Sequence, residues 1–136
     1  MFLLDTNVVS ELRRRRPHGA VLNWIDTVPA DQLFLSAVTI GEIQAGVELT
    51  KEQDVEKAAE IEAWLDMVVS SYGVLPMDAA AFREWARIKH RISDTLIEDA
   101  MIAATARLHR LTVATRNTRD FSGFFVETFD PFTYGG

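Results

Sequence analysis

The sequence contains no cysteine, only three histidines and no long uninterrupted apolar run. Without cysteine, disulfides and thiolate metal sites are excluded. His18, His90 and His109 lack the H-x-x-x-H or H-x-H spacing of a zinc site, so we expect them to be structural. No apolar stretch approaches the roughly 20 residues that a membrane-spanning helix needs, and the N-terminus lacks the pattern of a secretory signal. We therefore expect a cytoplasmic protein with no membrane partner.

A net positive charge is also missing. The 136 residues carry a net charge of −6, which argues against a protein that coats nucleic acid through overall attraction. The charge is unevenly distributed, however. Residues 42–66 contain eight acidic and two basic side chains, whereas residues 83–119 contain eight basic and four acidic ones. A basic surface can therefore coexist with an acidic one.

The length and the apolar content of 48% allow a substantial hydrophobic core, and no repeat or linker divides the chain, so we expect a single domain over residues 1–136. Short apolar runs alternate with helical periodicities, which predicts an α/β fold with a mainly parallel sheet covered by helices. The expected strands are 2–4, 33–35, 73–75, 111–114 and a weaker fifth at 125–127. The expected helices are about 7–14, 21–28, 40–49, 51–70, 78–88 and 96–109.

Acidic side chains lie at or after the ends of predicted strands and in the first turns of predicted helices. Asp5 ends the first strand and Asp120 follows the fourth, while Glu42 lies in the first turns of the helix after the second strand. In a parallel sheet these positions share the carboxyl edge, where ligands bind. Asp99 lies near the start of an apolar helix, and its convergence with the others is inferred from its expected burial.

Each of these acids also has a structural interpretation. Asp5 can cap the following helix, and Thr39 with Glu42 matches a capping box. Asn117 and Asp120 are typical turn and cap residues. Taken singly, these positions leave both interpretations open.

Asp99 is the hardest of the acids to explain structurally. Thr95 and Glu98 already supply a capping box, and Asp99 then enters the apolar run 100–104. An unpaired buried carboxylate costs several kcal/mol, and the nearest arginines in the sequence are not on the adjacent helical face. A divalent metal held by several carboxylates is the other solution. Oxygen ligands select Mg²⁺ or Mn²⁺, which predicts metal-dependent phosphodiester or phosphate chemistry.

Four segments of the sequence together resemble the motif regions of the PIN-domain ribonucleases, and most closely those of the VapC-type toxins of bacterial type II toxin–antitoxin modules. In chain order they are LLDTNVVSEL, SAVTIGEI, EDAMIAATA and TVATRNTRDF. The resemblance covers essentially the whole chain at the family's usual spacing. It implies a PIN-like three-layer α/β/α fold with four to five strands.

The resemblance also implies roles for individual residues. The catalytic and metal-binding carboxylates are Asp5, Glu42, Asp99 and Asp120, with Glu98 a neighbour of the motif. Family members place the fourth acid either where Asn117 stands or near Asp120; because the first position is an amide here, Asp120 is assigned as the acid. The positioning residues are Asn7, Thr115 and Asn117.

The activity implied by the resemblance is Mg²⁺- or Mn²⁺-dependent endonucleolytic cleavage of RNA by a metal-activated water. Members of the family usually form homodimers. A cognate antitoxin holds them inactive, wrapping the toxin with its C-terminal segment and often placing an Arg in the acidic pocket. The antitoxin usually supplies DNA binding for the pair.

Arginines near these motifs are candidate RNA contacts. Arg116 and Arg119 flank the fourth motif and are suited to bind RNA phosphates, which fix position rather than read sequence. Arg13 and Arg14 begin a block of four arginines, 13–16. This block is either a solvated helix end with cations against the macrodipole or a contact for RNA or antitoxin.

Three other classes of protein are alternatives to a nuclease. A haloacid-dehalogenase-type phosphatase needs a second Asp two residues after Asp5, where Asn7 stands. A phospho-receiver domain needs a Lys after a late strand, where Arg116 is the nearest cation. A catalytically inactive PIN-like interaction module, in which the acids only cap helices, is distinguished by a test of metal binding.

Overall fold

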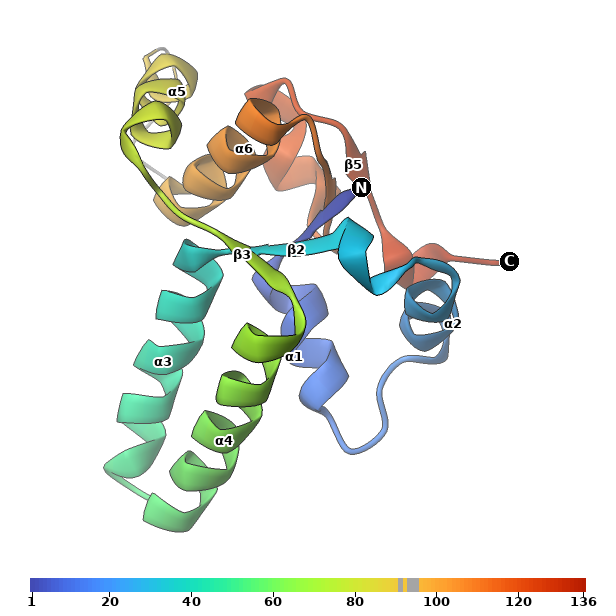
Figure 1. Ribbon diagram of the computed structural model, residues 1–136, viewed down its shortest axis with the longest axis vertical. Helices are drawn as coiled ribbons and strands as arrows, with labels where there is room; N and C mark the ends of the chain where they lie inside the picture. The colour runs from blue at the N-terminus through green and yellow to red at the C-terminus, as the bar shows by residue number, and fades with distance from the viewer. Residues whose placement is uncertain (91, 93–95) are drawn as a thin grey trace.

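The computed structural model describes residues 1–90, 92 and 96–136 of the chain. Its strands form a parallel five-stranded sheet with the order β3-β2-β1-β4-β5 (Figure 1). The strands are β1 Phe2–Leu4, β2 Leu33–Ser36, β3 Gly73–Leu75, β4 Thr112–Ala114 and β5 Thr128–Phe129.

Helices cover both faces of this sheet, as Figure 1 shows. The α-helices are α1 Thr6–Arg13, α2 Gly19–Thr27, α3 Ala37–Lys51, α4 Val55–Ser71, α5 Ala79–Lys89 and α6 Ile97–His109. Three 3₁₀ helices are η1 Ala30–Gln32, η2 Thr118–Phe124 and η3 Pro131–Thr133. Within these described ranges, no helix is long and apolar enough to cross a membrane.

Two hydrophobic clusters lie on opposite faces of the sheet. Successive side chains of a strand point to opposite faces, so Leu3 packs with Ile102 of α6 and Val113 of β4 in one cluster. Leu4 packs with Val8 of α1 in the other, together with side chains of α2 and α4. Leu3 and Leu4 are fully buried. The predicted three-layer α/β/α arrangement with a parallel sheet is thereby confirmed.

The structure corrects two predicted elements. The helix expected over 51–70 begins at Val55, because Asp54 caps it by accepting the backbone N–H of Lys57 at 3.0 Å. The fifth strand lies at 128–129 rather than 125–127. Phe125 adopts a left-handed backbone with φ of 52° after η2, which prevents extended pairing at that point.

The structure excludes the capping box of Thr39 and Glu42, which was one of the two interpretations that the sequence left open. The N-cap of α3 is Ser36, whose Oγ accepts the backbone N–H of Val38 at 3.1 Å. Thr39 and Glu42 therefore lie inside the helix, and the Glu42 carboxylate is not used as a cap. The other predicted capping box involves Thr95, which lies outside the described residues.

Candidate active site

Asp5 is fixed at the carboxyl end of β1 by three hydrogen bonds. Its carboxylate Oδ1 accepts the backbone N–H of Thr6 at 2.8 Å, which confirms the predicted helix cap. Its Oδ2 accepts from the hydroxyl of Thr115 at 2.7 Å and from the Asn7 side-chain amide at 3.1 Å. Asp5 is only 4% exposed. Burial outweighs these hydrogen bonds and raises the pKa of Asp5, and the nearby negative charge of Asp120 raises it further.

The donors to Asp5 come from the segments that follow two neighbouring strands, and they are themselves linked. Thr115 directly follows β4, which pairs with β1. The backbone N–H of Asn117 donates to the Thr115 hydroxyl at 3.0 Å, and the backbone N–H of Arg116 donates to Asn7 Oδ1 at 3.1 Å. The loop after β4 and the start of α1 therefore form one hydrogen-bonded unit around Asp5.

Glu42 reaches the same edge from α3. The hydroxyl of Thr6 lies 2.9 Å from Glu42 Oε1 and 3.1 Å from the hydroxyl of Thr39. Because a carboxylate only accepts, Thr6 donates to Glu42 and accepts from Thr39. Partial desolvation raises the pKa of Glu42 against the effect of the Thr6 hydrogen bond, and the charges of Asp5 and Glu98 raise it further.

Asp99 lies in the first turn of α6 and is half-buried. Within the described part of the chain its carboxylate has neither a hydrogen bond nor an ion pair, and Arg107, eight residues later on α6, pairs with Glu84 at 3.4 Å. Desolvation raises the pKa of Asp99 to about 6, with further increases from the negative charges of the surrounding acids. These acids are Asp5, Asp120, Glu42 and Glu98.

The four predicted carboxylates therefore share one electrostatic environment at the carboxyl edge of the sheet. Their donor atoms are all oxygens, which suits a hard divalent cation. Among the described residues, no three acidic or histidine side chains lie close enough to enclose an ion. The like charges thus face one another at a distance, and a bound cation would relieve the repulsion that, after desolvation, contributes to the raised pKa values of Asp5, Glu42 and Asp99.

Two of the predicted RNA-contacting arginines have defined surroundings. Arg13 lines a groove of about 250 Å³ together with Thr6 and Glu42. Arg116 lies with its guanidinium over the ring of Phe132, 4.3 Å from the ring centre. The Arg13 side chain is therefore placed beside Glu42, whereas the Arg116 guanidinium lies against η3.

The other two predicted arginines differ from these. Arg14 forms an ion pair with Glu11 at 3.4 Å, and its side chain is otherwise exposed. Glu11 also accepts the backbone N–H of His18 at 2.9 Å, so it joins α1 to the start of α2. Arg119 is exposed on η2, next to Asp120.

Sequence reasoning missed three side chains of the site. Thr6 and Thr39 orient Glu42, and the only sequence signal for Thr6 is its position beside Asp5. Phe132 supports Arg116 from η3, far along the chain from the other motifs. No local pattern in the sequence indicates this contact.

A PIN domain family profile matches residues 2–124. With the parallel sheet and the acidic edge described above, this match shows that the chain belongs to the PIN domain family. It is similar to the toxin FitB of Neisseria gonorrhoeae, with 36% identity covering 96% of this chain and 98% of FitB.

Two further comparisons agree with this assignment. The chain is 35% identical to the VapC ribonuclease Y4jK of Sinorhizobium fredii, covering 96% of this chain and 97% of Y4jK. The crystal structure of FitAcB from Neisseria gonorrhoeae superposes with a TM-score of 0.87 at 34% identity. That likeness covers 98% of this chain and 99% of the other.

Proposed function

We propose that this chain is the toxin of a type II toxin–antitoxin module and acts as a metal-dependent endoribonuclease. The observation that carries the proposal is that four carboxylates from separate parts of the chain interact electrostatically at the carboxyl edge of the parallel sheet. The names of the relatives, a toxin and a ribonuclease, support the same activity.

The cofactor we propose is Mg²⁺ or Mn²⁺, held by the oxygen donors of Asp5, Glu42, Asp99 and Asp120. When bound, such a cation lowers the pKa of a coordinated water and neutralises charge that develops on the phosphate. Asn117 is a positioning residue in this assignment, since its backbone N–H fixes the Thr115 hydroxyl.

The chain's own hydrogen bonds determine how Asp5 is presented. Two donors, Thr115 and Asn7, already occupy Oδ2, whereas Oδ1 accepts only the backbone N–H of Thr6. A carboxylate oxygen has two acceptor positions, so Oδ1 keeps one of them available. Thr115 and Asn7 therefore orient Asp5 so that one acceptor position on Oδ1 remains available to a cation.

RNA is the substrate we propose, with the scissile phosphate beside the acids and neighbouring phosphates bound by arginines. Arg116 is held over Phe132, which reduces the orientational freedom lost on binding a phosphate. Arg13 and Arg14 at the end of α1, and Arg119 on η2, are further candidates for phosphate contacts.

The proposed protein partners are a cognate antitoxin and a second copy of this chain, with DNA contacted only through the antitoxin. An apolar groove of about 240 Å³ lies among α1, α2 and α4 and includes Trp64. Trp64 also lines the groove that contains Glu42. An antitoxin segment bound along both grooves would reach the acids, where a cationic side chain would pair with them.

Cleavage of total cellular RNA by the purified protein tests this function. With Mg²⁺ or Mn²⁺ we expect discrete fragments, which disappear with EDTA and with Asp99→Asn. The amide keeps the volume of the side chain and removes the charge that binds the cation, so the fold is expected to remain. A variant that cuts RNA at the wild-type rate would refute the assigned site.

Calorimetric titration with Mn²⁺ separates the remaining outcomes. An absence of both cleavage and metal binding would instead favour a catalytically inactive PIN-like interaction module. Metal binding without cleavage would retain the cation site while contradicting the ribonuclease activity on cellular RNA.

A further inference from the structure

Phe125 directly follows η2, the helix that carries Asp120 in its first turn. It has no part in the acidic cluster, but η2 connects it to that cluster. Its side chain is 85% exposed, the largest value among the exposed large apolar side chains of the described chain. Its backbone is left-handed, with φ of 52°, a strained conformation for a residue with a side chain. The preceding Phe124 is buried and packs edge to face on Phe121, at 5.9 Å between ring centres. This anchor and the left-handed residue together hold the Phe125 ring in solvent.

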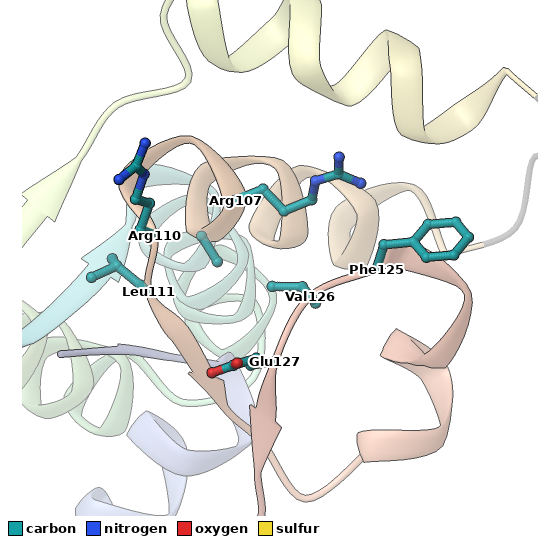
Figure 2. Close-up of a pocket in the computed structure, with 7 residues that line it drawn as sticks. Arg107, Arg110, Leu111, Phe125, Val126 and Glu127 are labelled. Atoms are coloured by element: carbon teal, nitrogen blue, oxygen red, sulfur yellow. The ribbon is translucent and has the colours of Figure 1, made fainter.

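The exposed ring stands between two cavities. One, of about 380 Å³, lies between the end of α6 and the segment that leads into β5 (Figure 2). Its lining includes Arg107, Arg110, Leu111, Phe125, Val126 and Glu127. The other cavity, of about 500 Å³, shares Arg107 and Phe125 with the first and is also lined by Arg87 of α5.

The charged side chains at the first cavity differ in whether they already have a partner. Arg107 is fixed, because its Nε lies 3.4 Å from Glu84 and its Nη1 donates to the Phe124 carbonyl at 3.1 Å. The guanidinium of Arg110 has no ion pair or hydrogen bond to any residue that the structure describes. Glu127 is the opposing charge, and it accepts from the hydroxyl of Thr112 at 3.4 Å. Arg110 is thus the cation available to an incoming anion.

Two elements connect this cavity to the acidic cluster. The helix α6 carries Asp99 at one end and Arg107 eight residues later, about 12 Å along its axis. The helix η2 carries Asp120 near its start and leads directly into Phe125. A strand of RNA at the acids can therefore continue over α6 or η2 to the cavity.

The charge distribution favours this side of the molecule for a polyanion. The hairpin of α3 and α4 projects away from α5 and α6 in Figure 1. It contains most of the strongly acidic segment 42–66, whereas the predominantly basic segment 83–119 includes most of α5 and all of α6. RNA that approaches along the hairpin meets repulsion, and RNA at the C-terminal end of α6 meets the cations Arg107 and Arg110.

We infer that the cavity beside Phe125 is a second RNA contact, which binds an unpaired nucleotide away from the scissile bond. The base stacks on the Phe125 ring, and Arg110 binds a phosphate of the same segment. Proteins that bind single strands combine these two features, an aromatic ring and a cationic groove. The inference rests on the proposed function, because the strand held here is the one that reaches the acids.

Binding of a short fluorescent oligouridylate to the full-length protein tests the inference. EDTA is present throughout, so that no cleavage occurs, and affinity is measured by anisotropy. Phe125→Leu keeps an apolar side chain and removes the ring, so we expect affinity to fall between about 5-fold and 100-fold. Phe125→Trp keeps a stacking surface and is expected to bind like the wild type.

Charge variants address the phosphate contact. Arg110→Ala is expected to weaken binding and to reduce the slope of log affinity against log salt by about one. The matched controls lie on the acidic hairpin: Lys51→Ala removes one positive charge there, and Leu49→Ala truncates an exposed apolar side chain. Both controls are expected to leave affinity and salt slope unchanged.

Several outcomes would overturn the inference. These are no RNA binding by the wild type, equal affinity of Phe125→Leu and the wild type, or an equal loss in Phe125→Trp and Phe125→Leu. The last would show that the Phe125 ring acts through its own packing and does not stack on a base. A separate cleavage assay with Mn²⁺ keeps the two proposals apart. Cleavage with ring-independent binding refutes only the second contact, whereas ring-dependent binding without cleavage refutes only the ribonuclease.

Discussion

Asp5 and Asp99 are two carboxylates of one cluster that are held in opposite ways. Asp5 is almost fully buried and accepts three hydrogen bonds from the start of α1 and the end of β4. Asp99 is half-buried on α6 and accepts none from the residues that the structure describes. Burial raises the pKa of both, but only for Asp5 do hydrogen bonds oppose it.

The difference separates two requirements of the proposed cation site. Hydrogen-bond donors around Asp5 fix the direction of the one acceptor position left on Oδ1, which is what a precise ligand needs. Among the residues that the structure describes, Asp99 has no such donor, and a charge without a partner there would favour the binding of a cation. In the proposed site, the Asp5 region would therefore supply geometry and the Asp99 region electrostatic attraction.

Among the variants that test this comparison of Asp5 with Asp99, the largest loss of cleavage is expected from Thr115→Val. The change removes one hydrogen-bond donor to Asp5 and keeps the volume of the side chain. We expect cleavage to fall by about 10- to 100-fold through loss of ligand orientation. Stability should fall by about 1–3 kcal/mol, because the Asn117 N–H also loses its acceptor. Steady-state cleavage and urea unfolding measure the two changes.

Thr105→Val is the matched control for this variant. Thr105 is also fully buried, and its hydroxyl donates to the Met101 carbonyl at 3.0 Å within α6. This change is expected to lower stability without lowering cleavage by the folded protein. Equal losses of cleavage in Thr105→Val and Thr115→Val would contradict a specific role for Thr115.

A smaller change in stability is expected for Asp99→Asn, and it is a gain where Thr115→Val causes a loss. The pKa of Asp99 is raised from 3.8 to about 6, so the folded state binds more protons than the unfolded state between these values. Stability therefore falls as pH rises through this window. Asp99→Asn removes the penalty and should be more stable than the wild type at pH 7, by about 1 kcal/mol after allowance for solvent screening.

Urea unfolding in EDTA at pH 7 and at pH 4 measures this difference, which should shrink at the lower pH. Asp26→Asn on the exposed face of α2 is the control, and it is expected to show no comparable gain. Lower stability of Asp99→Asn than of the wild type at pH 7 would show that the carboxylate has a stabilising partner.

The sequence predicts much of the fold because short apolar strands that are buried on both faces leave a clear pattern. Residues 2–4 and 33–36 are examples, and the acids that follow such strands are brought together by parallel pairing alone. The position of β5 is not predictable in this way. It depends on the left-handed conformation of Phe125, where no glycine marks the turn.

The supporting side chains of the site are less predictable than the acids. Ser36 and Thr39 are both good helix caps by residue type. Only the structure shows that Ser36 caps α3, so that Glu42 has no capping role. Phe132 comes from a distant segment and meets Arg116 only through tertiary packing. Periodicity and local motifs contain no information about such a contact.

The smallest effect is expected from Phe132→Leu, which tests an orienting contact outside the acidic cluster. The leucine keeps apolar packing beside His18 but removes the ring beneath the Arg116 guanidinium. A cation–π contact at an exposed site contributes about 0.5–1 kcal/mol, so KM for RNA should rise about 2- to 5-fold with kcat unchanged. Phe82→Leu is the control, since its ring makes an edge contact with Trp85 and no cation–π contact with an arginine among the described residues. A fall in kcat with constant KM in Phe132→Leu would instead indicate that the ring supports the catalytic acids, which would place Phe132 with the Asp5 region rather than with substrate binding.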